Sequence, residues 1–307
     1  MVNTSNIINK LNIFWQYPAR SEEIFYIQNK GDYNYIGMPW ATIHDKRVDL
    51  KQIYNELRPL LDVNKYYYTS CQHIAFNKFI LLWKALRINK VYVSHKRKGI
   101  NNINGIELIP MPLYAVNVED ENFNKEFKDI DKLIIERPYI YSFIGAYQQA
   151  DYMSDIRPKI FNMIHPDNTI IRNTGVWHLD KLVFNNMQNK NGQLNTSEAH
   201  NIKTKYYNEV LIKSRYSLCP SGSGPNSIRF WESLAIGSIP ILLSDTLELP
   251  KHELWKDAII ELEENKINDI NKIIEEITNE REKIMRKNCI KIYEDLKNNF
   301  KNKNNVM

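Results

Sequence analysis

The chain has 307 residues, of which 43% are apolar and 25% are charged, and its formal net charge is +5 at pH 7. This length can bury the core of one large domain or of two medium ones, and the composition is ordinary for a globular protein. The small excess of positive charge suits phosphate-bearing ligands or an anionic membrane surface, but it is too weak to indicate nucleic-acid binding.

The three cysteines, Cys71, Cys219 and Cys289, lie far apart in the chain. This spacing argues against a disulfide framework and a structural zinc site, and it favours a reducing compartment. The N-terminus lacks the apolar segment of a signal peptide, and no apolar run reaches the ~18 residues of a transmembrane helix. We therefore expect a cytoplasmic protein, with peripheral membrane contact left open through the basic run Lys96–Lys98.

In the first half, the short apolar stretches Ile13–Trp15 and Ile24–Ile27 are predicted strands. Phe76–Leu86 has apolar residues at helical spacing, and a predicted strand, Val91–Ser94, follows it. A helix followed by a strand indicates parallel strands joined by crossovers. The polar segment Asp120–Lys132 is interpreted as a surface connection to the second half.

The second half continues the same alternation. Tyr139–Gly145 and Thr169–Arg172 are predicted strands, Met153–Ile164 and Tyr206–Lys213 are predicted helices, and Gln188–Glu198 is a predicted loop. These elements again favour a parallel sheet covered by helices.

The C-terminal segment has a strongly helical pattern from Ile267 to Phe300, because isoleucines recur there at i, i+3, i+4 and i+7. The polar tail after Lys297 is expected to fray.

The segment Ser214–Pro250 predicts a strand, a loop, a helix and a second strand. Pro225 is expected in the first turn of the helix, with Ser223 or Asn226 as its cap, and Gly237 is expected just after its end. The predicted elements are strand Tyr216–Cys219, loop Pro220–Gly224, a helix ending at Gly237 and buried strand Ile239–Leu243.

A loop that joins the carboxyl end of a strand to a helix N-terminus can bind an anion, since free N–H groups and the helix dipole face the ligand. The small residues of Ser221–Gly224 would let a diphosphate approach the backbone. Arg229 can donate a forked pair of hydrogen bonds to phosphate, and Glu232, one turn on, can accept from ribose hydroxyls. Alternatively, the loop is an ordinary connection and the two charged residues form a surface pair.

The same segment resembles the exostosin family of glycosyltransferases. The family pattern runs from a strand-end Cys-x-x-Pro through Ser-x-Arg-x-x-Glu to Glu-Leu-Pro; here Cys and Pro are adjacent, a small departure. The matching positions are Cys219, Pro220, Ser227, Arg229, Glu232, Ser233, Leu234, Gly237, Ile239–Ile241, Ser244–Asp245 and Glu248–Pro250.

A second match is Ser142–Gly145 with Arg157 downstream, which looks like the start of the family's donor domain. Together with the long C-terminal helix, the resemblance covers roughly residues 139–295. Two segments of the first half, Gly37–Asp45 and Tyr66–Ile74, also look like those of short bacterial exostosin-like proteins.

The resemblance implies an α/β fold of GT-B type, in which two Rossmann-like domains face a cleft. We place an acceptor-side domain at residues 1–135, a nucleotide-sugar-binding domain at 136–265, and a C-terminal helix with a frayed tail at 266–307. It also implies transfer of a sugar from a nucleotide sugar, commonly a UDP-sugar, to a glycan or lipid-linked glycan, usually with inversion. The shortness of the chain and its lack of a membrane anchor point to a bacterial or viral enzyme of surface polysaccharide (O-antigen- or capsule-like) synthesis.

By the same resemblance, Arg229 would contact the diphosphate and Glu232 the ribose. The remaining residues that we assign to donor binding are Gly145, Arg157, Ser221, Gly222, Ser223, Asn226 and Ser227.

Inverting transfer needs a general base for the acceptor hydroxyl. His73 and Asp45 are our first choices, ahead of His44 and His95, because all four are expected in loops or near strand ends of the first half. For any single histidine a structural role stays the alternative. His178 in the second half is interpreted as structural, and for Trp40 stacking on a sugar and burial in the core are both left open.

No metal site is predicted, and no cofactor is expected beyond the nucleotide sugar, which is a substrate. The string Asp129–Asp131 resembles the Asp-x-Asp motif of metal-dependent transferases, but it lies in a charged segment that we interpret as a solvated linker. The leading alternative function is a non-catalytic nucleotide- or glycan-binding module derived from a transferase. A dehydrogenase or kinase is disfavoured, because neither GxGxxG nor GxxxxGK[ST] is present.

Overall fold

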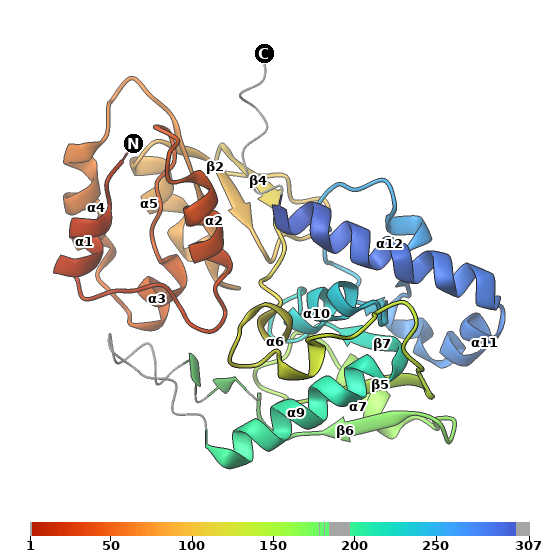
Figure 1. The fold of residues 1–307 in the computed structure, drawn as a ribbon. Helices are drawn as coiled ribbons and strands as arrows, with labels where there is room; N and C mark the ends of the chain where they lie inside the picture. The colour runs from red at the N-terminus through yellow and green to blue at the C-terminus, as the bar shows by residue number, and fades with distance from the viewer. Residues whose placement is uncertain (1, 178, 181, 184–196, 299–307) are drawn as a thin grey trace.

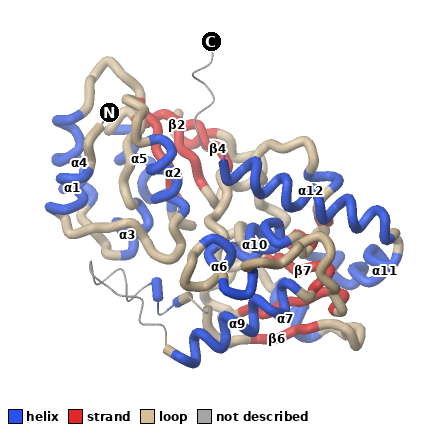
Figure 2. Tube along the Cα trace, viewed as in Figure 1, coloured by secondary structure: helices blue, strands red, loops and turns tan. Residues whose placement is uncertain are grey.

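The computed structural model describes residues 2–177, 179–180, 182–183 and 197–298. It has two α/β bodies, each with its own sheet and its own apolar core. Figure 1 shows the first body, red to yellow, beside the second, green to blue, and Figure 2 shows the strands inside with helices around them. Of the predicted segments, His178, most of Gln188–Glu198 and the tail beyond residue 298 lie outside the described residues.

The first body holds a four-stranded sheet of order β1-β2-β4-β3, in which β1, β2 and β4 are parallel and β3 is antiparallel to β4. Its strands are β1 Tyr67–Cys71, β2 Ile88–Val93, β3 Asn102–Ile103 and β4 Ile106–Pro110; its helices are α1 Ser5–Lys10, α2 Ser21–Asn29, α3 Trp40–Asp45, α4 Leu50–Leu57 and α5 Ile80–Ala85.

The predicted helix Phe76–Leu86 is confirmed as a 3₁₀ turn, Phe76–Phe79, followed by α5. The two N-terminal strand predictions are wrong. Ile24–Ile27 lies within α2, where Phe25 is buried and Ile27 is exposed, and Ile13–Trp15 is not a strand. Helical periodicity therefore decides which side chains of α2 reach the core.

The second body holds a five-stranded, fully parallel sheet of order β6-β5-β7-β8-β9. Its strands are β5 Tyr139–Gly145, β6 Ile170–Asn173, β7 Ser214–Pro220, β8 Ile239–Leu243 and β9 Ile260–Glu261. Its helices are α7 Ile156–Asn162, α9 Glu198–Ile212, α10 Ile228–Ile236, α11 Ile270–Glu275 and α12 Asn279–Asn298, and α6 Val116–Glu119 lies in the connection between the bodies.

The motif segment forms the predicted strand–loop–helix–strand unit, but its helix begins later than expected. Ser227 stands at the N-cap of α10 without a side-chain capping hydrogen bond, so Pro225 precedes the helix. Gly237 ends the helix in the left-handed region, with φ of 70°, as predicted. Strand β8 is buried along its whole length, which explains its continuous apolar sequence.

The predicted C-terminal helix is interrupted. After a 3₁₀ segment, Glu264–Asp269, it divides into α11 and α12, and the Thr278 hydroxyl accepts a hydrogen bond from the Arg281 amide at the start of α12. No helix among the described residues is long and apolar enough to cross a membrane.

The two bodies are joined along one edge by the loops after β2 and β8. The buried ammonium of Lys96 pairs with Glu248, and the Glu248 amide donates to the Lys96 carbonyl oxygen at 3.0 Å. The Lys98 amide donates to the Thr246 carbonyl oxygen at 2.8 Å. The carboxyl ends of β2 and β8 are therefore held together.

The C-terminal end of α12 makes a second connection, since it lies near β4 (Figure 1). The Lys297 ammonium is 2.7 Å from a carboxylate oxygen of Glu119, and the Gln28 amide group donates to the Lys297 carbonyl oxygen at 3.1 Å. The last helix of the second body thus contacts both the connection and α2 of the first body.

Candidate active site

The loop after β7 is held in place by its own backbone and by its neighbours. The Ser221 amide donates to the Leu243 carbonyl oxygen at 2.9 Å, and the Ser221 hydroxyl donates to a carboxylate oxygen of Glu264 at 2.8 Å. The Gly222 amide donates to the Gly224 carbonyl oxygen at 2.9 Å. Ser223 is exposed at the tip of this turn. These hydrogen bonds anchor the loop to β8 and to the segment around Glu264.

The loop touches the first body at Gly224. A Cβ atom there would lie 2.5 Å from Nδ1 of His95 and 2.6 Å from Cγ2 of Ile74, so only glycine fits this approach. The buried Asn226 makes the adjacent contact, because its Nδ2 donates to the Ser94 carbonyl oxygen at 2.7 Å. Asn226 therefore connects the two bodies instead of capping α10.

Arg229, in the first turn of α10, contacts two aromatic rings. Its guanidinium carbon is 4.7 Å from the centre of the Phe143 ring and 5.2 Å from that of Tyr207, and Nη2 donates to the Ile144 carbonyl oxygen. Gly145 leaves room for this packing, since a Cβ atom there would lie 2.8 Å from Phe143 and 3.4 Å from Arg229. Arg229 is only half-buried, so part of the residue remains open to a ligand.

Arg157 supports the loop from inside. Its Nε donates to the Ser221 carbonyl oxygen at 2.8 Å, and its Nη1 donates to the Ala146 carbonyl oxygen at 2.7 Å. Burial lowers the pKa of Arg157 to about 10, so it stays charged at neutral pH. The structure thus brings Gly145, Arg157, the loop and Arg229 together at the carboxyl ends of β5 and β7.

Glu232 lies on the same helix but is buried, with 1% of its surface exposed. Its Oε1 accepts from the Asn117 amide at 2.9 Å and its Oε2 accepts from the Tyr207 hydroxyl at 2.6 Å. Burial raises the pKa of Glu232. Both carboxylate oxygens already have protein partners, and the contact with a ribose stays a prediction.

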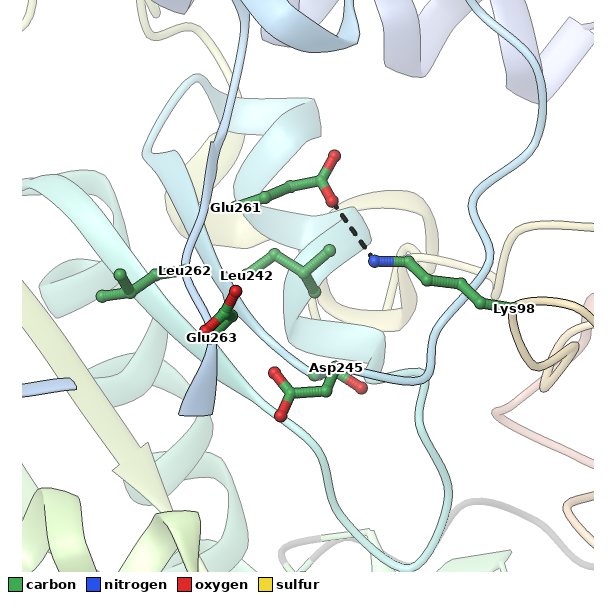
Figure 3. Close-up of a pocket in the computed structure, with 7 residues that line it drawn as sticks. Lys98, Leu242, Asp245, Glu261, Leu262 and Glu263 are labelled. Carbon is green, nitrogen blue, oxygen red and sulfur yellow. Dashed lines mark ion pairs between the residues drawn. The ribbon is translucent and has the colours of Figure 1, made fainter. Parts of the chain in front are cut away.

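A cavity of about 510 Å³ lies at the carboxyl ends of β8 and β9, on the side of the loop where Ser221 meets Glu264. Figure 3 shows Lys98 of the first body directed towards Glu261, at 3.5 Å, with Asp245 close by. The lining residues are Lys98, Leu242, Ser244, Asp245, Glu261, Leu262 and Glu263. Three carboxylates and one ammonium line this cavity, so it disfavours a diphosphate and suits groups with N–H or O–H donors.

On the acceptor side, Asp45 accepts several hydrogen bonds. Its Oδ1 is 3.1 Å from Nε2 of His73 and 3.3 Å from Nδ1 of His44, and its Oδ2 accepts from the Gln16 amide at 3.0 Å. Asp45 ends α3 and His73 follows β1. Because Ile74 touches Gly224, this cluster lies next to the donor-side loop.

The hydrogen-bond partners fix the protons of both imidazoles. The Ala75 amide can only donate, so Nδ1 of His73 accepts at 3.0 Å and Nε2 carries the proton towards Asp45. In the same way the Lys78 ammonium, 3.1 Å from Nε2 of His44, leaves the proton on Nδ1. Asp45 is therefore a carboxylate that accepts from two imidazole N–H groups.

The ligand atoms of His44, Asp45 and His73 all lie within 4.8 Å of one another, a spacing that could hold a metal ion, but the outer hydrogen bonds of the two histidines disfavour one. A histidine ligand offers one nitrogen to the metal and donates from the other to an acceptor. Here the outer nitrogens face the Ala75 amide and the Lys78 ammonium, which are donors. The inner nitrogens consequently carry protons where a metal would need lone pairs.

The charges follow from these contacts. Burial by itself raises the pKa of Asp45, but hydrogen bonds from His73 and His44 outweigh it and lower the pKa below its ordinary value. His95 is buried, and desolvation with nearby positive charge lowers its pKa to about 3, so it stays neutral. Burial is also the first cause that lowers the pKa of His44.

The other candidates have different surroundings. Trp40 is fully buried against Phe79 and Trp83, so it belongs to the core. Asp129 and Asp131 lie in an exposed turn, where Asp131 accepts from the Leu133 amide. Sequence reasoning did not identify Gln16, which no local pattern marks.

Residues 67–277 match the exostosin GT47 domain. The chain belongs to the exostosin GT47 family. The family match also confirms the GT-B architecture expected from the sequence.

Similarity to individual GT47 relatives is partial. The chain is 25% identical to Exostosin-1 homolog of Caenorhabditis elegans over 205 residues, which cover 66% of this chain and 52% of that protein. It is 26% identical to Ribitol-5-phosphate xylosyltransferase 1 of Mus musculus over 145 residues, 46% of this chain and 27% of that protein. It is 42% identical to Exostosin-1c of Danio rerio over 60 residues, 19% of this chain and 8% of that protein. The chain therefore spans about half the length of the first of these relatives and less of the others.

Proposed function

We propose that this chain is a glycosyltransferase that moves a sugar from a nucleotide sugar, in particular a UDP-sugar, to a hydroxyl group of a glycan. The contact of Gly224 with His95 and Ile74 carries the proposal, because it sets the ordered loop beside the Asp45 cluster. The names of two relatives, a xylosyltransferase and a probable glucuronoxylan glucuronosyltransferase of Arabidopsis thaliana, support glycosyl transfer.

In this proposal the diphosphate binds at the start of α10, near Arg229 and the loop. The N-terminal end of α10, where Ser227 makes no side-chain capping hydrogen bond, and the half-buried Arg229 both favour a negative charge there. Hydroxyl and N–H groups of the donor occupy the acidic cavity beside Ser221. The diphosphate is placed beside the positively charged Arg229, and the hydrogen-bond donors of the sugar nucleotide are placed beside the carboxylates of the cavity.

The transfer step is an inverting displacement. Asp45 takes the proton of the acceptor hydroxyl, whose oxygen attacks the anomeric carbon from the face opposite the diphosphate. The bond from that carbon to the diphosphate oxygen breaks, and Arg229 stabilises the charge that develops on the leaving group. We assign the proton to Asp45 and not to His73, because Nδ1 of His73 accepts from the Ala75 amide and Nε2 already carries a proton, whereas Oδ2 of Asp45 accepts from Gln16 with one of its two lone pairs.

We also propose that the reaction needs no metal ion and takes place in the cytoplasm, on a glycan or lipid-linked glycan of surface polysaccharide synthesis. The donors around the Asp45 cluster support the first point. The three buried, unpaired cysteines support the second.

A nucleotide panel and a transfer assay test the proposal together. We expect UDP to raise the melting temperature, and UDP-sugar turnover with a glycan acceptor to persist in EDTA. A strict requirement for Mn²⁺ or Mg²⁺ would overturn metal independence. Binding of UDP without hydrolysis or transfer of any UDP-sugar would favour a binding module, and no stabilisation by any nucleoside diphosphate would refute the donor site.

A further inference from the structure

A buried hydrogen bond joins the two helices beside the donor-side loop. The Tyr207 hydroxyl, on α9, donates to Oε2 of Glu232, on α10, at 2.6 Å, and both side chains are buried. Oε1 of Glu232 accepts from the Asn117 amide at 2.9 Å. The carboxylate is thus satisfied inside the protein, as a buried charge requires.

The ring of Tyr207 also contacts the guanidinium of Arg229. The Arg229 guanidinium carbon lies 5.2 Å from the centre of the Tyr207 ring and 4.7 Å from that of Phe143. Its hydrogen bond to the Ile144 carbonyl oxygen involves only Nη2. A cation over aromatic rings is held in place while its other N–H groups remain available to a ligand. The position of the guanidinium therefore depends on the position of the Tyr207 ring.

We propose that Glu232 is a positioning residue that acts through Tyr207: it fixes the ring that holds Arg229, and it does not bind the donor's ribose itself. The inference rests on the proposed function, in which Arg229 contacts the diphosphate. Tyr207 becomes a positioning residue for the same reason.

The burial of Glu232 supports this assignment over direct ribose contact. Glu232 is only 1% exposed, so a ribose hydroxyl could reach its carboxylate only if the groups that cover it moved. Such a movement would strain the hydrogen bonds from the Tyr207 hydroxyl and the Asn117 amide, and a buried donor left without its acceptor is costly.

Calorimetric titration of the full chain with UDP, 2′-deoxy-UDP and 3′-deoxy-UDP tests the inference. The variants are Tyr207→Phe, Glu232→Gln and the double variant. Tyr206→Phe, on the exposed part of α9, and Glu209→Gln, on the same helix, are the controls. Melting temperatures are measured beside each titration.

We expect each single variant to weaken UDP binding about three- to tenfold. The UDP affinity of the double variant should be no lower than that of the single variant that binds UDP more weakly, because the two residues act as one unit. The ratio of UDP affinity to either deoxy-UDP affinity stays at the wild-type value in Glu232→Gln. The controls bind UDP as the wild type does.

Three outcomes would overturn the inference alone. The first is a ratio of UDP affinity to deoxy-UDP affinity that falls to about one in Glu232→Gln, which would show that Glu232 contacts the ribose directly. Another is additive losses in the double variant. The last is lowered melting temperatures with unchanged UDP affinity, which would mean a purely structural role. Failure of the wild-type chain to bind UDP would instead overturn the proposed UDP donor, and this inference with it.

Discussion

The loop and helix of the donor side come from one continuous segment, 214–250, whereas Gln16, Asp45 and His73 of the acceptor side come from three separate segments. On the donor side a strand, a turn and a helix already place small residues and an arginine together. On the acceptor side only the folded sheet brings α3 next to the end of β1. The first kind of site can be recognised from local sequence, and the second depends on tertiary contacts.

The largest expected effect is on the rate of transfer, when the proposed base of the acceptor side is removed and the donor side is left intact. Asp45→Asn should lower the rate of transfer by about 10²- to 10⁴-fold, the usual contribution of a general base. UDP affinity, measured by titration, should stay at the wild-type value because Asp45 lies on the acceptor side. The exposed Asp167→Asn is the matched control. A transfer rate within twofold of the wild type would exclude Asp45 as the base.

The complementary change removes the donor-side cation. Arg229→Ala should weaken UDP binding by about ten- to a hundredfold, since charge-assisted hydrogen bonds contribute roughly 1.5–3 kcal/mol. Arg172→Ala, at an exposed position on β6, should leave the UDP affinity unchanged. Equal affinities for UDP in the Arg229 variant and the wild type would show that the diphosphate does not bind at α10.

A third change tests the place where the two sides meet. Gly224→Ala puts a methyl group against His95 and Ile74, so the free energy of unfolding should fall by about 1–3 kcal/mol. Urea denaturation measures this loss. Gly31→Ala, where a Cβ atom meets nothing within 4 Å, should stay within about 0.5 kcal/mol of the wild type. Equal stability of the two variants would mean that the contact is looser than described.

The last prediction concerns a carboxyl group beneath the acceptor side. Burial raises the pKa of Glu22 from 4.5 to about 8, with Asp45 and Cys71 nearby. Between these values the folded chain keeps a proton that the unfolded chain releases, so stability should fall as the pH rises from about 5 to 8. Glu22→Gln should flatten this slope in urea melts at several pH values, and Glu23→Gln should not. A wild-type slope in Glu22→Gln would contradict the shift.

The sequence predictions succeed where local signals are strong. Strands β5 and β8 have the predicted bounds, because each is a mostly apolar run with a turn residue at its end: Gly145 for β5 and Ser244, just after the strand, for β8. Gly237 likewise follows the end of α10 as predicted, and it lies in the left-handed region. In the second body, pattern alone predicted most elements of the sheet and the helices that cover it.

The predictions fail where tertiary contacts decide. Strand β1, Tyr67–Cys71, was not predicted as a strand, and its polar residues are buried because they hydrogen-bond within the first body: Thr69 accepts from the Trp40 indole and Ser70 lies 3.0 Å from the Tyr35 hydroxyl. Similarly, Asn226 was expected to cap a helix but bonds to Ser94 of the other body. Such partners are distant in sequence, so no local pattern indicates them.

The edge where Lys96 meets Glu248 limits how halves of related proteins can be exchanged. Glu248 belongs to the Glu-Leu-Pro end of the family motif, yet here it neutralises an ammonium of the other body. A chimaera that took its donor half from a relative without a carboxylate at this position would leave the buried Lys96 without its counter-charge, with Asn101 as its remaining acceptor, at a cost of up to about 3–5 kcal/mol. Residues 96 and 248 therefore have to be inherited, or redesigned, as a pair.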